Sequence, residues 1–326
     1  MRDEDYRLLL AACQQTAFNL PRLQSIQGQT AEESAKSIDR ELEGFLGAVF
    51  QDRQRISNAA IDAMQPLLMV YDFALLQICD LSYFAWKNDD SRIKLIWPST
   101  KLPRRPKPTH VFYVLVSNLA QLLQAVRLLL LNGFEGQGRA IFRSFVELAD
   151  LTLAVLADEN VYRNYITSYD DHDKEYRHWR RNLAPAVMRR RLIKLDAELD
   201  IASTTAIPAS EVREDTYSWF SLFSHVNFVA HIVSAYPTPL GGEGVADAPR
   251  AMLGEAGEMT HSTFARALLY IWLFFSHCDR LLWERHKWGR FRGDRWRGWY
   301  RYRARAFDTL FRQNYRQLQG IADDDV

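Results

Sequence analysis

One segment of the sequence, residues 136–156, combines a helical pattern with an apolar surface on nearly every side. At about 100° per residue, four charged side chains fall within a stripe roughly 80° wide, and large apolar side chains occupy most of the remaining circumference. The four charged residues are Arg139, Arg143, Glu147 and Asp150. A helix of this kind must be buried, and buried charges require polar partners. The sequence therefore predicts that the stripe faces a cleft or partner groups inside the fold.

The periodicity of the chain favours an all-α fold. Apolar residues recur at intervals of three and four, and the alternation typical of β-strands is absent. With 326 residues, 48% of them hydrophobic, the chain can bury a full core. We therefore expect a multi-helix bundle with antiparallel long helices and no significant sheet.

Proline, glycine and charge divide the chain into five expected parts. These are an N-terminal helical subdomain (1–91), a proline-rich basic linker (92–109), a core helical domain (110–240), a flexible loop (241–258) and a C-terminal part (259–326) with an apolar helix and a basic aromatic helix. The segment starting at Thr30 predicts a capped helix start, and Pro66 predicts a kink. Asn132-Gly133 predicts the turn of an antiparallel helix pair.

The cysteines and the apolar runs indicate a cytoplasmic protein without a membrane span. Cys13, Cys79 and Cys278 are odd in number, widely spaced and free of C-x-x-C patterns, as expected in a reducing compartment. The longer apolar runs are interrupted by polar or charged residues, and the acidic N-terminus lacks the bases of a signal peptide.

No motif predicts a metal or another cofactor. Neither paired C-x-x-C, H-E-x-x-H nor a nucleophile elbow is present, which excludes a motif-based zinc-enzyme or serine-hydrolase assignment. The acidic cluster 170–173 carries carboxylates suited to a divalent cation. Adjacent residues on a helix point around its axis instead of converging, so we predict no metal there.

A second polar stripe lies on the helix predicted for residues 211–236. Tyr217, Ser221 and His225 are spaced by four and share one face. If that face meets Arg143 and Glu147, the five side chains would form a cleft suited to acid/base chemistry on a phosphodiester or to holding an anion. In the alternative interpretation, Arg143 and Glu147 form an ion pair within their helix and the other polar groups satisfy each other in the core.

These two spaced motifs resemble a family of bacterial helical proteins known mainly as a domain of unknown function. In that family an R-S-x-x-E helix precedes a Y-x3-S-x3-H helix, and the match covers about residues 110–240. The resemblance carries over six positions: Arg143, Ser144, Glu147, Tyr217, Ser221 and His225. It implies a helical fold without assigning a reaction.

Such helical families are similar, more distantly, to the nucleotide-binding HEPN-like bundles, whose members include metal-independent ribonucleases of defence systems. Those nucleases carry an arginine and a histidine separated by four to six residues, often with a polar residue after the arginine. One such spacing joins Arg280 to His286, with Leu281 at the polar position. The resemblance therefore implies RNA or nucleotide handling, with no catalysis carried onto these residues.

The C-terminal segment is strongly basic and aromatic. Residues 280–316 hold eleven Arg and one Lys against three acidic residues, a local charge of +9 in a chain of net charge +1. Guanidinium groups interleaved with rings are typical of nucleic-acid surfaces. The predicted contacts are Arg290, Arg292, Arg295, Trp296, Arg297, Trp299, Arg301 and Arg303. An anionic membrane surface, or a terminal helix that docks its rings into the bundle, would explain the same composition.

The sequence thus supports two functions of different classes. The first is RNA or nucleotide handling in a defence or stress setting, with or without enzymatic activity. The second is a non-enzymatic interaction or scaffold protein whose polar stripes are structural and which binds a protein partner, a second copy in a dimer included.

Overall fold

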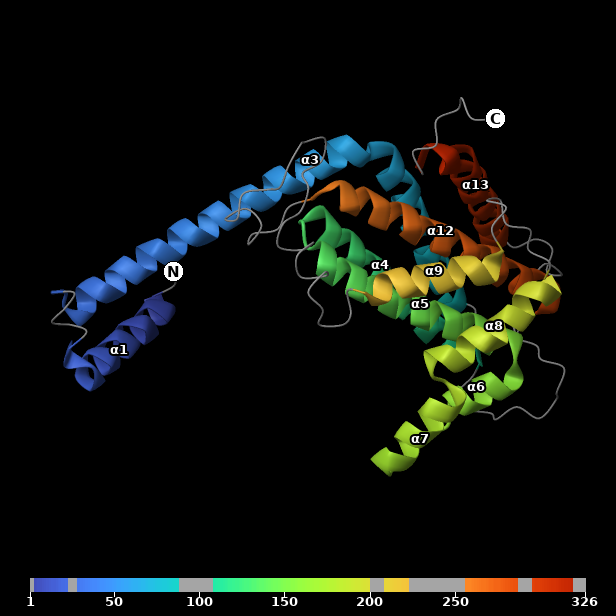
Figure 1. Cartoon of the computed structure of the whole chain (residues 1–326), viewed down its shortest axis with the longest axis horizontal. Helices are drawn as coiled ribbons and strands as arrows, with labels where there is room; N and C mark the ends of the chain where they lie inside the picture. Colours follow the sequence, from blue (N-terminus) through green and yellow to red (C-terminus); the bar gives the residue numbers. More distant parts are fainter. Residues whose placement is uncertain are drawn as a thin grey trace. The chain divides into compact units, whose positions relative to one another are not determined.

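The computed structural model describes residues 3–22, 28–87, 108–199, 208–222, 256–286 and 295–318, with the side chains of the last range given for 298–314. These residues are almost entirely helical and form no strand, which confirms the predicted all-α class. The helices in Figure 1 are α1 (Asp3–Asn19), α3 (Ala31–Lys87), α4 (Pro108–Leu131), α5 (Glu135–Ala157), α6 (Glu159–Tyr165), α7 (His172–Asn182), α8 (Pro185–Leu199), α9 (Ala209–Ser221), α12 (Glu258–Arg280), the π-helix η1 (Leu281–Arg285) and α13 (Arg295–Leu318).

The chain divides into two compact units, Met1–Asn58 and Ala59–Val326. The smaller unit contains α1 and the first part of α3. Thr30 and Glu33 form the expected capping box at the start of α3, because each side chain accepts a hydrogen bond from the other residue's backbone N–H. The predicted linker, 92–109, lies almost wholly outside the described residues.

The larger unit begins within α3, which is kinked close to Pro66. Met64 has non-helical backbone angles (φ −119°, ψ 18°), while helix continues on both sides. A proline removes one backbone donor and its ring clashes with the carbonyl four residues earlier, so the preceding turn must open. The kink expected from the sequence is therefore present.

Helices α4 and α5 form an antiparallel pair whose turn depends on two glycines. Gly133 has φ +76°, a left-handed conformation that terminates α4 as predicted. Gly138 lies where a Cβ atom would be 2.8 Å from Leu130 Cδ2. The absence of a side chain at Gly138 thus allows α5 to approach α4 closely.

Helix α5 is the centre of the larger unit, contacting α4, α8, α9 and α12 (Figure 1). Its apolar side is packed into an aromatic core in which the Phe142 and Phe220 ring centroids are 4.5 Å apart. Tyr270 and Phe274 of α12 meet Phe145 edge to face in the same core. The burial predicted for this helix is confirmed.

The last helix docks part of its aromatic surface into the larger unit. Tyr300, Phe307 and Phe311 are buried, and the Phe311 ring stacks on Trp272 with centroids 5.2 Å apart. The Tyr300 hydroxyl donates a hydrogen bond of 2.9 Å to Asp279. For these three rings, the structure agrees with the docked-helix alternative for the basic aromatic segment.

Two helices, α3 and α4, contain windows long and apolar enough to cross a membrane. About half of each window is buried inside the molecule, which is also the pattern of a core helix in a soluble protein. The expectation of a cytoplasmic protein without a membrane span therefore stays a prediction.

Replacing Phe311 by alanine should lower the free energy of unfolding by about 3–5 kcal/mol, because the buried ring would leave a cavity against Trp272. Trp299→Ala, which removes a half-exposed ring from the same helix, should cost clearly less. Urea denaturation of both variants measures the difference, and equal losses would contradict the docking described for α13.

Candidate functional site

The charged stripe of α5 meets polar partners at three levels along the helix. We refer to these as the Arg139 layer (Glu135, Arg139, Thr260, Thr263), the Arg143 cluster (Arg143, Glu147, Arg189, Tyr217) and the Arg213 network (Asp150, Asp196, Arg213, Tyr270, His277). The stripe therefore faces polar partner groups inside the fold, as predicted. The three levels differ in burial, and this difference separates structural from ligand-accessible groups.

The Arg139 layer is closed to solvent. Arg139 is fully buried, forms an ion pair with Glu135 and donates a 3.0 Å hydrogen bond from Nε to the Thr263 hydroxyl. Its guanidinium also lies 4.0 Å from the centroid of a Trp219 ring. Burial lowers the pKa of Arg139 to about 10, even though Glu135 opposes this change. Arg139 thus stays charged at neutral pH, and the layer acts as a buried clamp between α5 and α12.

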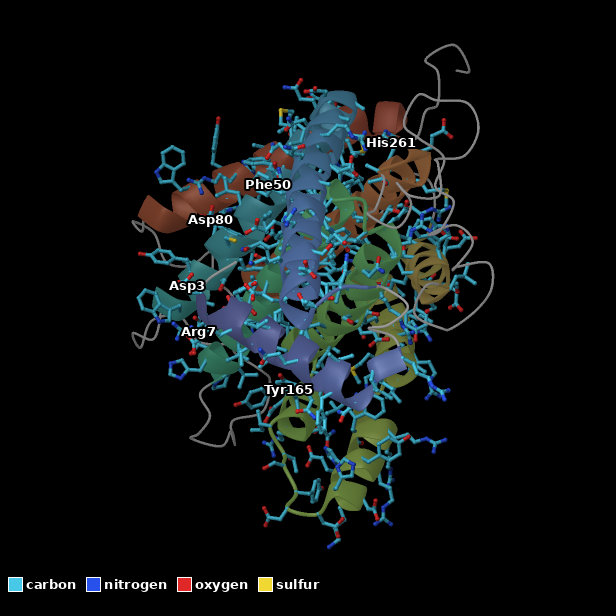
Figure 2. All side chains as sticks on the ribbon, turned by 90° about the vertical axis from the view of Figure 1, so that its left-hand side faces the viewer. Asp3, Arg7, Phe50, Asp80, Tyr165 and His261 are labelled. Atoms are coloured by element: carbon cyan, nitrogen blue, oxygen red, sulfur yellow. The ribbon has the colours of Figure 1, made fainter. Side chains whose placement is uncertain are left out.

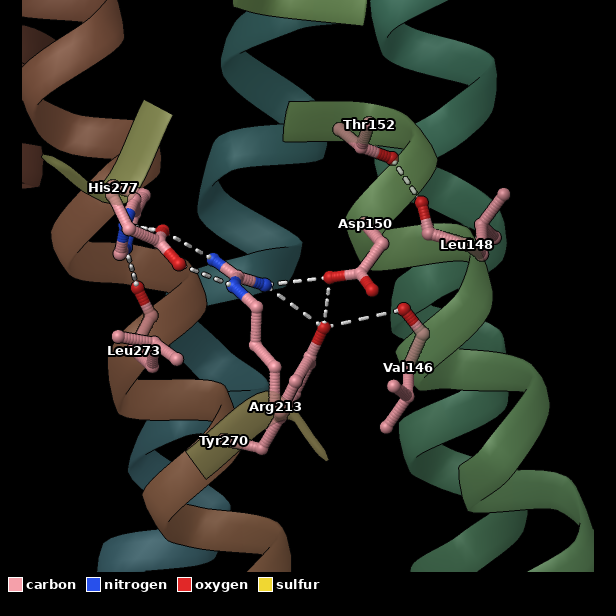
Figure 3. A network of polar contacts seen from close by, with 9 residues as sticks. Val146, Leu148, Asp150, Thr152, Arg213, Tyr270, Leu273 and His277 are labelled. Atoms are coloured by element: carbon pink, nitrogen blue, oxygen red, sulfur yellow. Dashed lines mark hydrogen bonds and ion pairs between the residues drawn. The ribbon is translucent and has the colours of Figure 1, made fainter. Parts of the chain in front are cut away.

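The Arg213 network lies at the opposite end of the stripe (Figure 3). Arg213 Nη1 donates to Asp150 over 2.6 Å, while its Nε and Nη2 bond to the two oxygens of Asp196 at 3.2 and 3.3 Å. The Tyr270 hydroxyl donates to the same Asp150 oxygen. His277 Nε2 is 2.5 Å from Asp196, and its Nδ1 is 2.9 Å from the Leu273 carbonyl oxygen.

The electrostatics of this network keep the arginine and one carboxylate ionised. Burial alone would lower the pKa of Arg213, but the carboxylates of Asp150 and Asp196 hold it above its usual value. Burial alone would raise the pKa of Asp196, whereas its contacts with His277 and Arg213 hold it below normal. The network therefore joins α5, α8, α9 and α12 through ion pairs between buried side chains.

The Arg143 cluster, between these two levels, is only partly covered. Arg143 donates from Nε to Glu147 over 3.1 Å and from Nη2 to the Tyr217 hydroxyl over 3.0 Å. The two ion-paired side chains are 21% and 32% exposed, respectively. Arg189 of α8 lies over the Tyr217 ring, 3.7 Å from its centroid. The predicted proximity of Arg143, Glu147 and Tyr217 is confirmed, and the cluster is our candidate site.

The hydrogen-bonding capacity of the cluster is not used up by its internal contacts. Because the Tyr217 oxygen accepts from Arg143, its own O–H proton is left to donate elsewhere. Arg189 forms no ion pair with a carboxylate among the described residues, and it is half-buried. Several donors and no excess of negative charge make this an environment for an anion.

The other predicted cleft residues do not join the cluster in the described part of the chain. Helix α9 runs antiparallel to α5, since Arg213 meets Asp150 and Tyr217 meets Arg143. Ser221, one turn beyond Tyr217, is therefore displaced toward the start of α5, and its buried hydroxyl has no partner among the described residues. Ser144 is exposed, and His225 lies outside the described residues.

The predicted nucleic-acid contacts of the C-terminal segment fall into two groups. Arg290 and Arg292 lie outside the described residues, as do the side chains of Arg295, Trp296 and Arg297. Trp299 is half-exposed, Arg301 lies 5.0 Å from the Trp283 ring centroid, and Arg303 forms an ion pair with Asp80. A phosphate at Arg303 would have to compete with that carboxylate.

Two weaker sequence patterns are used for structural contacts. Arg280 donates to the Leu199 carbonyl, and buried His286 lies 2.8 Å from the Leu156 carbonyl oxygen. In the acidic cluster 170–173, Asp171 caps α7. Its carboxylate accepts hydrogen bonds from the backbone N–H groups of Asp173 and Lys174, at 2.9 and 3.1 Å.

Sequence reasoning missed Arg189 and the partners of Asp150. Arg213 shares a helical face with the core residues Thr216 and Phe220, a spacing that indicates an inward-facing arginine. A buried aspartate on α5 required a buried cation, so the two signals together make Arg213 a candidate partner without fixing which cation pairs with which carboxylate. Arg189 has no comparable signal, because it stands in a run of three arginines.

Removing Asp150 should destabilise the protein far more than removing Glu147, one turn away on the same helix. Asp150→Ala leaves Arg213 buried and short of a partner, which should cost about 3–5 kcal/mol. Glu147→Ala opens a partly solvated pair and should cost about 1 kcal/mol or less. Chemical denaturation of the two variants measures this, and a large loss for Glu147→Ala would mean that the Arg143 cluster is a buried structural pair.

Comparison of the chain with protein-family models, with curated proteins and with solved structures found no match in any of the three. The resemblance to the bacterial helical family and to HEPN-like bundles therefore stays a prediction that rests on its motif residues. What this chain can do must be inferred from the chemistry of its own side chains, above all those of the Arg143 cluster.

Proposed function

We propose that this protein binds a phosphate-bearing ligand, RNA or a nucleotide, at the Arg143 cluster. The observation that carries the proposal is the position of Arg189, a half-buried guanidinium held 3.7 Å from the Tyr217 ring centroid and in no ion pair with a carboxylate among the described residues. Stacking on the ring fixes the guanidinium plane, so it loses little freedom when a phosphate binds.

The other groups of the cluster complement such a ligand. Tyr217 offers its hydroxyl proton, and Arg143 is oriented by Glu147 and Tyr217. Two guanidinium groups and one hydroxyl can surround the oxygens of a single phosphate with charge-assisted hydrogen bonds. Exposed Trp299 would add base stacking only if the ligand extended to the C-terminal helix.

The geometry supports binding more directly than catalysis. Acid/base cleavage of a phosphodiester needs a group that accepts a proton, and Glu147 is the carboxylate within the cluster. Its Oε1 already accepts from Arg143, so Glu147 would serve first to orient the guanidinium. We therefore propose a phosphate-binding protein and leave ribonuclease activity as a finer hypothesis.

The test is binding of short single-stranded RNA and of ATP to the full chain at low salt, measured by fluorescence anisotropy and calorimetry. We expect RNA affinity to fall with salt at a slope near −0.7 per phosphate contact. Arg189→Gln should weaken binding by about tenfold or more, since it removes a charge-assisted contact worth roughly 1.5–3 kcal/mol.

The matched control is Arg177→Gln, which removes the same charge from an exposed position of α7 outside the Arg143 cluster. Like many surface arginines it donates to its own helix, at the Asp173 carbonyl. Equal losses in both variants would indicate a non-specific charge effect. The proposal would be refuted if the wild-type chain bound neither RNA nor ATP at low salt.

An exposed apolar face in the smaller unit favours a second function, that of a self-associating interaction protein. Five large apolar side chains of α3 are 38–73% exposed, and Figure 2 labels one of them, Phe50; they are Ile38, Leu42, Phe45, Leu46 and Phe50. They fall on one face at helical spacing. Together they expose roughly 500 Å², about the apolar part of a standard interface of ~800 Å² per partner. A second copy of this chain would cover that face.

Replacing Leu46 by glutamate should convert a dimer of the wild-type chain to a monomer, because a charge would be placed within the buried face. Multi-angle light scattering over a range of concentrations measures the mass. Arg40→Glu, on the same helix, is the control and should leave the dimer intact. A wild-type chain that is monomeric at every concentration would contradict self-association.

A further inference from the structure

A cavity of about 700 Å³ lies beside the end of α5, between α6, α8 and η1. Its volume falls within the range of small-molecule sites, roughly 300–1,000 Å³. Four buried apolar side chains form its floor: Ala154, Val161, Leu192 and Leu195. The interior thus suits the apolar body of a ligand.

The cavity exists because α5 ends in small side chains where the chain changes direction. Ala154 and Ala157 line it, and at Asp158 the backbone becomes extended (φ −135°, ψ 118°) before α6 begins. The π-helix η1 then brings Arg285 to the end of α5, where Nη1 donates to the Ala157 carbonyl over 2.6 Å. Single π-helical turns occur frequently at functional sites.

The rim of the cavity carries more positive than negative charge. Each of its two carboxylates already has a cation: Asp158 pairs with Arg191 at 2.8 Å, and Glu198 lies 3.5 Å from Arg285. Arg190 and Lys194 line the same cavity and form no ion pair among the described residues. Because they are four residues apart on α8, both project to the same side.

From this combination of an apolar floor and two uncompensated cations, we propose that the cavity binds an amphipathic anion. The ligand class is an acyl chain or aromatic ring that carries one carboxylate or phosphate group. The body would replace water over Ala154 and Leu195, and the anionic head would lie between Arg190 and Lys194. The head is bound by charge, so carboxylate and phosphate share this chemistry.

This site is separate from the Arg143 cluster, although both use α8. At about 100° per residue, the mean direction of Arg190, Lys194 and Glu198 is roughly opposite to that of Arg189. Arg189 contacts Tyr217, whereas Arg190 and Lys194 line the cavity. The two proposals can therefore fail independently.

The experiment is isothermal titration of the full chain with octanoate and with octyl phosphate, and with octyltrimethylammonium as the oppositely charged probe. We expect one molecule of at least one anion per chain and far weaker binding of the cation. Preference between the two anions would identify the head group. Lys194→Glu, which reverses an exposed charge, should weaken anion binding by about tenfold or more.

A second variant tests the floor without changing charge. Ala157→Leu would fill part of the hollow at a half-buried position and should lower affinity for both anions. Arg177→Gln, which removes an exposed charge of α7 that lines neither the cavity nor the Arg143 cluster, is the control and should leave their affinities unchanged. Equal binding of the cation and the anions, unchanged affinity in both Lys194→Glu and Ala157→Leu, or no binding of either anion would overturn the proposal.

Discussion

The guanidinium of Arg213 is enclosed between the carboxylates of Asp150 and Asp196, which come from two other helices. Its pKa is held above the usual value, so the protein cannot relieve this burial by releasing a proton. The guanidinium must instead be neutralised by carboxylates placed next to it. This requirement fixes the rotation of α5 and α8, which carry the two carboxylates, relative to α9. His277 extends the same constraint to α12 through Asp196. The larger unit is therefore organised around a buried charge as much as around its aromatic core.

This constraint explains why the middle of the α5 stripe can serve a ligand. The Arg139 layer and the Arg213 network clamp α5 on both sides of Arg143, each through side chains that are almost wholly buried. Arg143 and Tyr217 thus stand on elements that cannot rotate away. A site on rigid helices loses little freedom when it binds, and this lowers the cost of holding a phosphate. The Arg139 layer and the Arg213 network thus hold the helices rigid, and the partly exposed Arg143 cluster carries the groups that can contact a ligand.

The helical class, the kink near Pro66, the Gly133 turn and the burial of α5 could be predicted because each depends on local periodicity or on one residue's backbone restriction. The Arg143–Tyr217 contact could also be predicted, since two narrow polar stripes must face each other inside a bundle. The register of α9 against α5 could not be predicted. Its antiparallel course moves Ser221 away from Arg143, and register depends on the Arg213 pairing, a contact between residues 63 positions apart. Long-range pairs of this kind leave no periodic signal in one sequence.

The three consecutive arginines of α8 show why a basic run cannot be interpreted as one patch. On a helix they point in directions about 100° apart, so each meets different surroundings. Arg189 stacks on Tyr217, Arg190 stands at the rim of the cavity, and Arg191 pairs with Asp158. Only the first two form no ion pair with a carboxylate among the described residues. A single helix thereby supplies one cation to each of two sites. The position of this helix is set by Asp196, nearly two turns beyond the first arginine, in the Arg213 network. The buried ion pair of Arg213 with Asp196 therefore also positions the arginines of the two surface sites, because all of these contacts share α8.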